Sequence, residues 1–100
     1  MAEADSPIEF EWDPRKAAAN ARKHGVTFEE AASVFGDPLA AIFTDEAHST
    51  GELREIIIGH SERNRLLLVS FAERAERIRI ISARSATRRE RRDYEENQFI

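Results

Sequence analysis

Residues 54–84 read REIIIGHSERNRLLLVSFAERAERIRIISAR, and this stretch decides the fold. It holds three runs rich in isoleucine, leucine and valine, and the polar connections between them have the length of hairpin loops. The pattern therefore predicts three strands that are antiparallel neighbours in one sheet: Arg54–Gly59, Arg65–Phe71 and Arg77–Ser82.

The residues at the start of the chain predict a strand and a helix. Apolar and acidic residues alternate over Ile8–Trp12, which is typical of a half-buried strand. Asp13 followed by Pro14 favours the start of a helix, because aspartate caps the first turn and proline suits its first position. We expect this helix to cover Arg15–Lys23 and to stop at Gly25.

A second helix is predicted to begin at Thr27, where Thr27 and Glu30 have the spacing of a reciprocal capping box. Its apolar stripe has helical spacing and consists of Phe28, Ala31, Ala32 and Phe35. Leu39–Phe43 is predicted to be a short strand that follows this helix, and Thr44–Leu53 a polar loop.

The last predicted element is a helix over Arg88–Glu96, which a second capping box between Thr87 and Glu90 introduces. This helix is polar on nearly all sides, and Tyr94 is its only aromatic residue. A helix with so little apolar surface is expected to lie across a sheet or against a partner.

Together these elements predict a small α+β domain that spans residues 1–100, with residues 1–7 as a flexible lead. The expected order is a strand, two helices, four strands and a helix, with an antiparallel sheet packed against the two N-terminal helices. With 100 residues, 41% of them hydrophobic and 34% charged, the chain is long enough for one modest core. It has neither a membrane-length apolar run nor the regions of a signal peptide, so we expect a cytoplasmic protein.

The positive charges are concentrated in the second half of the chain. The net charge is -4, yet ten of the thirteen arginines come after residue 62. Clustered arginine suits phosphate, because the planar guanidinium offers a fork of donors. Along the last strand, Arg77 and Arg79 are predicted to point to one face while Ile78 and Ile80 point to the other.

Arg74 and Arg84 flank that strand, so as many as four arginines are expected around one surface of the sheet. Four more continue the positive charge into the last helix: Arg88, Arg89, Arg91 and Arg92. Two interpretations remain open. The surface binds an anionic polymer, or it is a solvated face whose arginines pair with neighbouring acids such as Glu73, Glu76 and Glu90.

Few side chains here are suited to catalysis. The chain has no cysteine, so disulfides, thiolate metal sites and thiol nucleophiles are excluded. Its histidines, His24, His48 and His60, share no metal-ligand spacing, and neither a metal nor another cofactor is expected. The position of His24 is already explained by the helix dipole, which favours cations at a helix C-terminus. His48 and His60 are assigned no role.

A hydrolytic enzyme built from these residues would use general acid–base chemistry, which RNA permits because its own 2′-hydroxyl is the nucleophile. Such an enzyme needs a base, a cation for the phosphate and a proton donor for the leaving oxygen. Arginine can be the cation. The candidates for the other two roles are Glu73, His24 and Tyr94.

Several motifs in this order resemble the BrnT family of toxins. The resemblance covers most of the chain, from about Ile8 to Glu96. The motifs that carry it are Phe10-Glu11-Trp12-Asp13, Lys23-His24-Gly25-Val26, Phe28-Glu29-Glu30-Ala31, His48-Ser49 with Glu52 and Arg54, Gly59 with Ser61, the run Arg77–Arg84, and Thr87–Arg92 with Tyr94-Glu95. The resemblance implies a fold similar to RelE-type ribonucleases and the toxin of a type II toxin–antitoxin module, which cleaves RNA and arrests growth when free.

The same resemblance implies a partner, a BrnA-type antitoxin with a dimeric ribbon-helix-helix part. The antitoxin would neutralise the toxin, would form a complex of two toxins with two antitoxins, and would itself contact promoter DNA. The toxin would thus meet DNA only indirectly, and no membrane is involved.

Site residues are carried over from the family one by one. Arg74 and Glu73 align with the family's Thr-Glu-Arg stretch, in which Ala72 here replaces the threonine. Arg79 and Arg84 match the Arg-Ile-Ile-Ser-Ala-Arg run, and Tyr94 matches an aromatic residue of the last helix.

The leading hypothesis is therefore a metal-independent endoribonuclease. Arg74 and Arg84 hold the scissile phosphate, Glu73 or His24 is the base, and Tyr94 donates or positions a proton. The residues expected to bind substrate around them are Arg77, Arg79, Lys23 and Arg88.

Two other functions compete with this hypothesis. One is a catalytically silent binding module, or co-repressor, whose arginine-rich face docks an antitoxin-like partner. The other is a free-standing nucleic-acid-binding regulator, which the absence of a helix-turn-helix or zinc pattern and the negative net charge disfavour.

Overall fold

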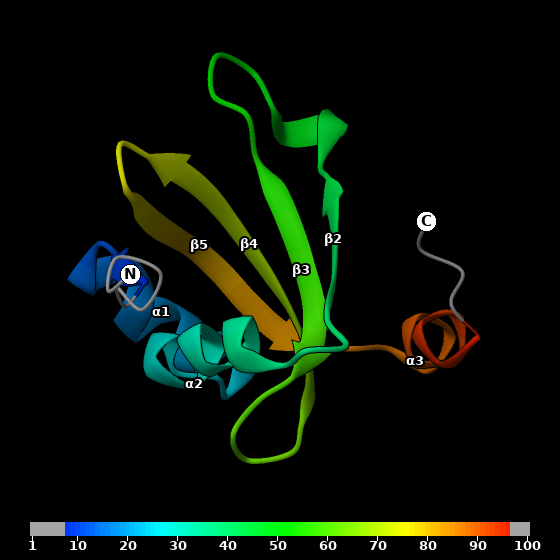
Figure 1. Ribbon diagram of the computed structural model, residues 1–100. Coiled ribbons are helices and arrows are strands. Elements are labelled where there is room, and N and C mark those ends of the chain that lie inside the picture. The colour runs from blue at the N-terminus through cyan, green and yellow to red at the C-terminus, as the bar shows by residue number, and fades with distance from the viewer. Residues whose placement is uncertain (1–7, 97–100) are drawn as a thin grey trace, which may run out of the picture.

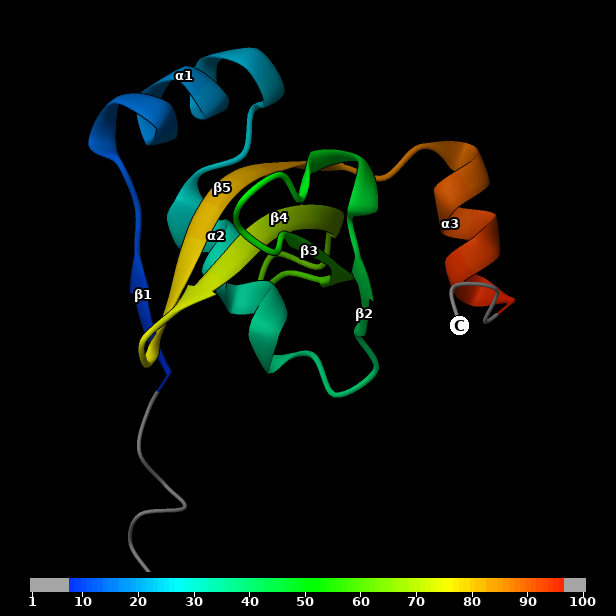
Figure 2. The ribbon, with the colours of Figure 1, turned by 90° about the horizontal axis from the view of Figure 1, so that it is seen from above.

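The computed structural model of the protein describes residues 8–96. These residues form one layer of sheet with helices beside it (Figures 1 and 2). The elements in chain order are β1 (Glu9–Glu11), α1 (Pro14–His24), α2 (Phe28–Ser33), the 3-10 turn η2 (Val34–Gly36), β2 (Ala41–Thr44), the 3-10 turn η3 (Glu46–His48), β3 (Glu55–His60), β4 (Leu66–Arg74), β5 (Arg77–Ser85) and α3 (Arg88–Glu95). Within the described part of the chain, no helix is long and apolar enough to cross a membrane.

The five strands make one sheet in the order β1-β5-β4-β3-β2. The predicted α+β class and order of elements are confirmed, and β2 to β5 form an antiparallel meander as expected. The expected antiparallel pairing holds for these four strands, whereas β1 at the edge of the sheet pairs with β5 in parallel. Alternation along Ile8–Trp12 identifies a strand, but it carries no information about the neighbour or the direction of that strand.

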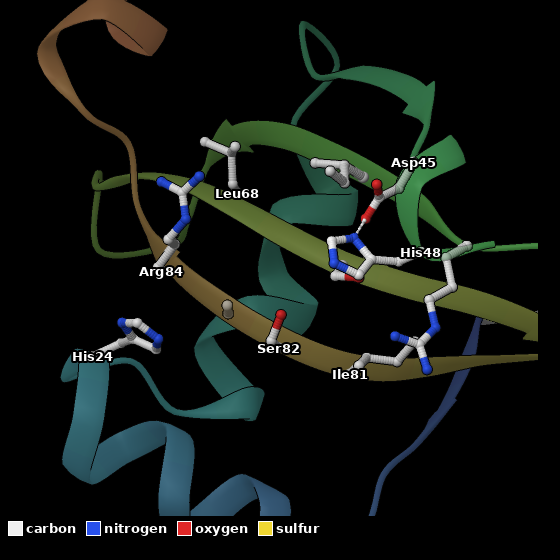
Figure 3. Close-up of a pocket in the computed structure, with 11 residues that line it drawn as sticks. His24, Asp45, His48, Leu68, Ile81, Ser82 and Arg84 are labelled. Atoms are coloured by element: carbon white, nitrogen blue, oxygen red, sulfur yellow. Dashed lines mark hydrogen bonds and ion pairs between the residues drawn. The ribbon is translucent and has the colours of Figure 1, made fainter. Parts of the chain in front are cut away.

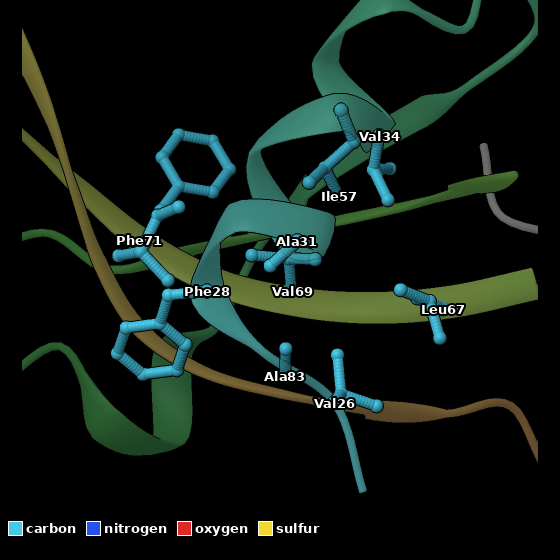
Figure 4. Packing of buried hydrophobic residues seen from close by; sticks show 10 residues of the cluster. Val26, Phe28, Ala31, Val34, Ile57, Leu67, Val69, Phe71 and Ala83 are labelled. Atoms are coloured by element: carbon cyan, nitrogen blue, oxygen red, sulfur yellow. The ribbon is translucent and has the colours of Figure 1, made fainter. Parts of the chain in front are cut away.

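Helices α1 and α2 cover one face of the sheet and enclose the core. The predicted stripe of α2 supplies Phe28 and Ala31, which are fully buried. Figure 4 shows the packing of this cluster, whose buried members are Val26, Phe28, Ala31, Val34, Ile57, Leu67, Val69, Phe71, Ile80 and Ala83. Burial of these side chains is the main favourable contribution to folding.

Local signals end the helices where the sequence predicted. The Asp13 carboxylate accepts a hydrogen bond from the Arg15 backbone N–H, and Gly25 stops α1 with a φ of 69°.

The reciprocal capping box expected between Thr27 and Glu30 is only half formed. Thr27 accepts from the Glu30 N–H, but the Glu30 carboxylate turns inward and accepts from Ser61 and Arg65. Being 3% exposed, Glu30 needs these donors, which also keep its pKa below the usual range of glutamate.

A β-bulge in β5 decides which face its last residues occupy. Ser70 pairs with Ser82 and the next residue, Phe71, pairs with Ile80, so Ile81 is an extra residue. Before the bulge Ile80 points into the core, and after it Ala83 does so. Arg84 is thereby placed on the face away from α1 and α2, whereas strict alternation would have put it on the face of Ile80.

The amide of Asn20 fixes α1 to β5 just after this bulge. Its nitrogen donates to the carbonyl oxygens of Val26 (2.9 Å) and Ala83 (2.8 Å), and its oxygen accepts from the Ala83 N–H (3.1 Å). Asn20 is 7% exposed, so water cannot readily replace these bonds.

We expect Asn20→Ala to lower the free energy of unfolding by about 2–3 kcal/mol, because it leaves buried backbone groups of Val26 and Ala83 unpaired. Urea denaturation measures this difference. Lys16→Ala is the matched control, since Lys16 is exposed on the same helix and its change should stay within about 0.5 kcal/mol. Equal stability of the two variants would contradict the role given to Asn20.

Candidate functional site

The face of the sheet opposite α1 and α2, called the open face below, carries a hollow of about 450 Å³. Figure 3 shows this hollow and the side chains around it. Its lining residues come from α1, from the loop between β2 and β3, and from β3, β4 and β5; they are His24, Asp45, His48, Arg54, Ile56, Leu68, Ser70, Ile81, Ser82, Ala83 and Arg84. The hollow therefore combines an apolar floor with two histidines and two arginines.

The loop between β2 and β3 supplies one of the histidines with an orienting partner. His48 Nδ1 lies 3.0 Å from Asp45 Oδ2, so the carboxylate can accept a hydrogen bond from that nitrogen. The other ring nitrogen, Nε2, is then left to interact with a substrate. Ser49 holds the loop closed, because its hydroxyl bonds to the carbonyl of Asp45 (2.7 Å) and accepts from the Arg54 N–H (3.0 Å). The bonds of Ser49 thus keep Asp45, His48 and Arg54 at one rim of the hollow.

The other histidine, His24, is the last residue of α1 and reaches the hollow from the opposite side of β5 (Figure 3). Two contacts fix the turn that follows it. Asn20 bonds to Val26, and the Arg65 guanidinium donates to the Gly25 carbonyl (3.1 Å). His24 and His48 therefore line the same hollow from opposite sides of β5, and separate contacts hold the two segments in place.

Arg84 is the arginine of the hollow whose side chain is paired. Its two terminal nitrogens donate to Glu90 of α3 at 2.8 and 2.9 Å, a bidentate geometry. The Arg84 guanidinium lowers the pKa of Glu90 to about 2, helped by the Thr87 N–H, and the same pairing raises the pKa of Arg84. Both partners stay charged at neutral pH, and α3 is tied to the edge of the hollow.

The other arginines predicted for this surface share the open face but lie outside the hollow. Each has a carboxylate partner: Arg74 Nε is 2.8 Å from Glu52, Arg77 Nε is 3.2 Å from Glu9, and Arg79 Nη1 is 3.5 Å from Glu11. For Arg74, Arg77 and Arg79, the structure therefore agrees with the second interpretation of the sequence, in which the arginines pair with nearby acids on a solvated face.

Glu73 and Tyr94 do not meet Arg84 in the hollow. Glu73 lines a separate groove of about 340 Å³ on the opposite face of the sheet. The Tyr94 hydroxyl donates to the Leu39 carbonyl (3.3 Å), and its ring packs edge-on against His60 with 5.7 Å between centroids. Burial and the nearby Asp37 carboxylate raise the pKa of Tyr94. Through its contacts with Leu39 and His60, Tyr94 anchors α3 to the body of the protein.

Among the residues predicted for the site, only His24 and Arg84 line the hollow. Lys23 and Arg88 are exposed outside it. The sequence analysis missed five polar residues of the hollow: Asp45, His48, Arg54, Ser70 and Ser82. One local signal could have found part of this set, since Asp45 and His48 are three residues apart in a polar loop, a spacing that suits an oriented histidine.

Comparison with known proteins finds one matching family model and a solved structure of similar fold. A family model described as "Ribonuclease toxin, BrnT, of type II toxin-antitoxin system" matches residues 12–90, which include all residues that line the hollow. The crystal structure of the Brucella abortus ribonuclease toxin BrnT is similar with a TM-score of 0.63 and 24% identity, covering 82% of this chain and 100% of that chain. At this identity the structural likeness shows the fold. No curated protein sequence matches significantly.

The Arg84–Glu90 pair predicts how stability depends on pH. The pKa of Glu90 falls from 4.5 to about 2 on folding, so its contribution is complete above pH 4.5 and is lost as the pH falls toward 2. We expect Glu90→Gln, which can keep the capping bond, to lower the free energy of unfolding by about 1 kcal/mol at pH 7, since Arg84 is partly exposed to solvent.

This difference should shrink as the pH falls from 4.5 to 2, measured by thermal unfolding at several pH values. The matched control is Glu29→Gln, an exposed acid of α2 for which no ion pair is found among residues 8–96. A Glu90→Gln deficit that is independent of pH would show that the pair does not act through charge.

Proposed function

The chain belongs to the BrnT family of type II ribonuclease toxins, and on that premise we propose that it is an endoribonuclease whose active site is the hollow of the open face. One observation carries the proposal. Two histidines, one of them oriented by a carboxylate, line a single hollow together with two arginines. Acid, base and phosphate-binding groups are the parts that RNA cleavage requires.

The reaction is an internal transesterification. The 2′-oxygen attacks phosphorus as its proton passes to a base, and the bond from phosphorus to the 5′-oxygen breaks as that oxygen takes a proton from an acid. The products are a 2′,3′-cyclic phosphate and a free 5′-hydroxyl. The pentacoordinate phosphorus carries extra negative charge, which nearby cations stabilise.

His48 is suited to be the base, because the Asp45 carboxylate fixes the orientation of its ring and leaves Nε2 for the substrate. His24, on the other side of the hollow, is then placed to be the acid. Arg54 and Arg84 bind the phosphate between them, and the phosphate competes with Glu90 for Arg84. Arg84 thus keeps the phosphate-binding role considered from the sequence. His24 changes from candidate base to acid in place of Tyr94, and His48 and Arg54 replace Glu73 and Arg74.

We propose that cleavage is independent of metal ions. The two histidines of the hollow can supply both proton transfers without a metal-bound hydroxide.

The partner belongs to the same proposal. Type II toxins act with an antitoxin, and we propose a BrnA-type antitoxin with a dimeric ribbon-helix-helix part in a complex of two toxins and two antitoxins. Neutralisation would occur in the cytoplasm, and the toxin would meet promoter DNA only through the antitoxin. Free toxin is expected to arrest growth by cleaving RNA.

A catalytically silent binding module remains the second candidate, and one observation favours it. Arg74, Arg77, Arg79 and Arg84 all have carboxylate partners in the free chain, as expected for a surface that serves stability or docking. Growth arrest on expression of the chain alone separates the two, since a silent module leaves growth unchanged.

The decisive measurement is cleavage of an end-labelled single-stranded RNA in EDTA. We expect the wild type to produce 2′,3′-cyclic phosphate ends, and His24→Ala and His48→Ala each to lower the rate by about 10²–10⁴-fold, the usual contribution of a general acid or base. His60→Gln is the matched control, because His60 lies outside the hollow.

Circular dichroism would verify that each variant is folded. Wild-type rates in the His24 and His48 variants would refute the proposed site. Cleavage that EDTA abolishes would refute metal independence.

A further inference from the structure

Among residues 8–96, the arginines of α3 differ from those that immediately precede them in having no carboxylate partner. Each of the six arginines between Arg63 and Arg84 lies within 4.0 Å of an acidic side chain. On α3, by contrast, Arg88, Arg89, Arg91 and Arg92 are exposed, and no ion pair is found for them within residues 8–96. Four cationic groups on one short helix are therefore available to an external anion.

The way α3 docks leaves these arginines pointing outward. Glu90 and Tyr94, one helical turn apart, face the body of the protein, where they bond to Arg84 and to Leu39. Tyr94 also packs against the small apolar cluster of Ile58, Leu66 and Leu68. Figure 2 shows that α3 lies to one side of the sheet and not over either face of it. The arginines occupy the remaining sides of the helix.

The same docking places this charge next to the hollow. Arg84 lines the hollow and forms an ion pair with Glu90 in the first turn of α3. The first turn of α3 therefore lies next to the part of the hollow that is proposed to bind phosphate. Figure 3 shows Arg84 at the end of the hollow from which the chain leads on to α3. Positive charge therefore continues from Arg84 onto the helix.

We propose that α3 is a second phosphate-binding segment, which holds the RNA strand beyond the cleaved bond and makes a single strand of several nucleotides the preferred substrate. This inference rests on the proposed function. It adds a requirement for length, because a dinucleotide has one phosphate between its nucleosides, which the hollow binds, and offers none to the arginines of α3.

Two features of α3 favour a nucleic acid strand over an acidic protein. The outward sides of the helix carry only charged residues, whereas a stable protein interface has an apolar centre. Arg88 and Arg92 are also a like-charge pair at i and i+4, separated by about 6 Å along the helix axis. Consecutive phosphates of an extended strand can relieve that repulsion, and guanidinium binds them through two parallel hydrogen bonds.

The test compares a long and a short substrate. A labelled 20-nucleotide single strand and a dinucleotide, each with one cleavable bond, are digested by the wild type and by Arg88→Ala, Arg89→Ala, Arg91→Ala, Arg92→Ala combined. We expect kcat/KM on the long strand to fall about tenfold or more in this variant, since charge-assisted bonds to phosphate are lost. The rate on the dinucleotide should stay unchanged.

Salt dependence gives a second readout. The slope of log(1/KM) against log[salt] on the long strand should become less steep by about 0.7 for each phosphate contact removed. Arg15→Ala, Lys16→Ala is the matched control, because both residues are exposed cations at the start of α1, at the end of the helix away from His24. This control should retain the wild-type rate and slope.

The outcomes separate the two proposals. If the variant cleaves the long strand as fast as the wild type, the role of α3 in RNA binding is refuted and its arginines are left for a protein partner. If the control loses as much as the α3 variant, only net charge matters and the inference also fails. If the wild type cleaves neither substrate, the proposed function itself fails.

Discussion

The hydrogen bonds of one buried amide set the geometry on which the rest of this structure depends. Asn20 joins α1 to both backbone groups of Ala83 in β5 and to the turn after α1. Ala83 is two residues beyond the extra residue Ile81, so the bonds act where β5 changes the face of its side chains. Because Asn20 is one turn from the end of α1, the same bonds also bring His24 to the rim of the hollow.

The distribution of carboxylates explains how an acidic chain can present a positive surface. The acids of β1, of the loop before β3 and of α3 lie beside arginines of the open face, as Glu11, Glu52 and Glu90 show. Their charge is compensated locally, whereas no ion pair is found for the arginines of α3 among the described residues. Within the same residues, Arg54 of the hollow has only a longer-range attraction to Glu52. Net charge alone is therefore a poor guide to which ligands this protein attracts, since short-range fields depend on local pairing.

Much of the fold could be predicted because its signals are local. Alternation identified β1, and apolar runs with hairpin-length connections identified β3, β4 and β5. The Asp13-Pro14 and Thr87–Glu90 pairs marked helix starts that the structure confirms. Two features that these local signals did not reveal have a common cause. The parallel pairing of β1 and the inward turn of Glu30 depend on partners far along the chain, Arg77–Arg79 for β1 and Arg65 for Glu30. Neither partner can be read from a window of neighbouring residues.

The candidate site was less predictable than the fold for the same reason. His24 and Arg84 were recognised as candidates, but their meeting with His48 and Arg54 joins elements that are as many as 60 residues apart (84 minus 24). Glu73 and Arg74, adjacent in sequence, lie on opposite faces of the sheet, because successive side chains of a strand alternate.

The sequence by itself determined the order of the elements, the ends of the helices and the supply of arginine, since these follow from short-range sterics, capping and composition. Only the tertiary structure decided which of these residues share a site. The bulge at Ile81 and the bonds of Asn20 set the face of Arg84 and the position of His24. Both depend on the register of packed strands, which is a cooperative property of the whole sheet.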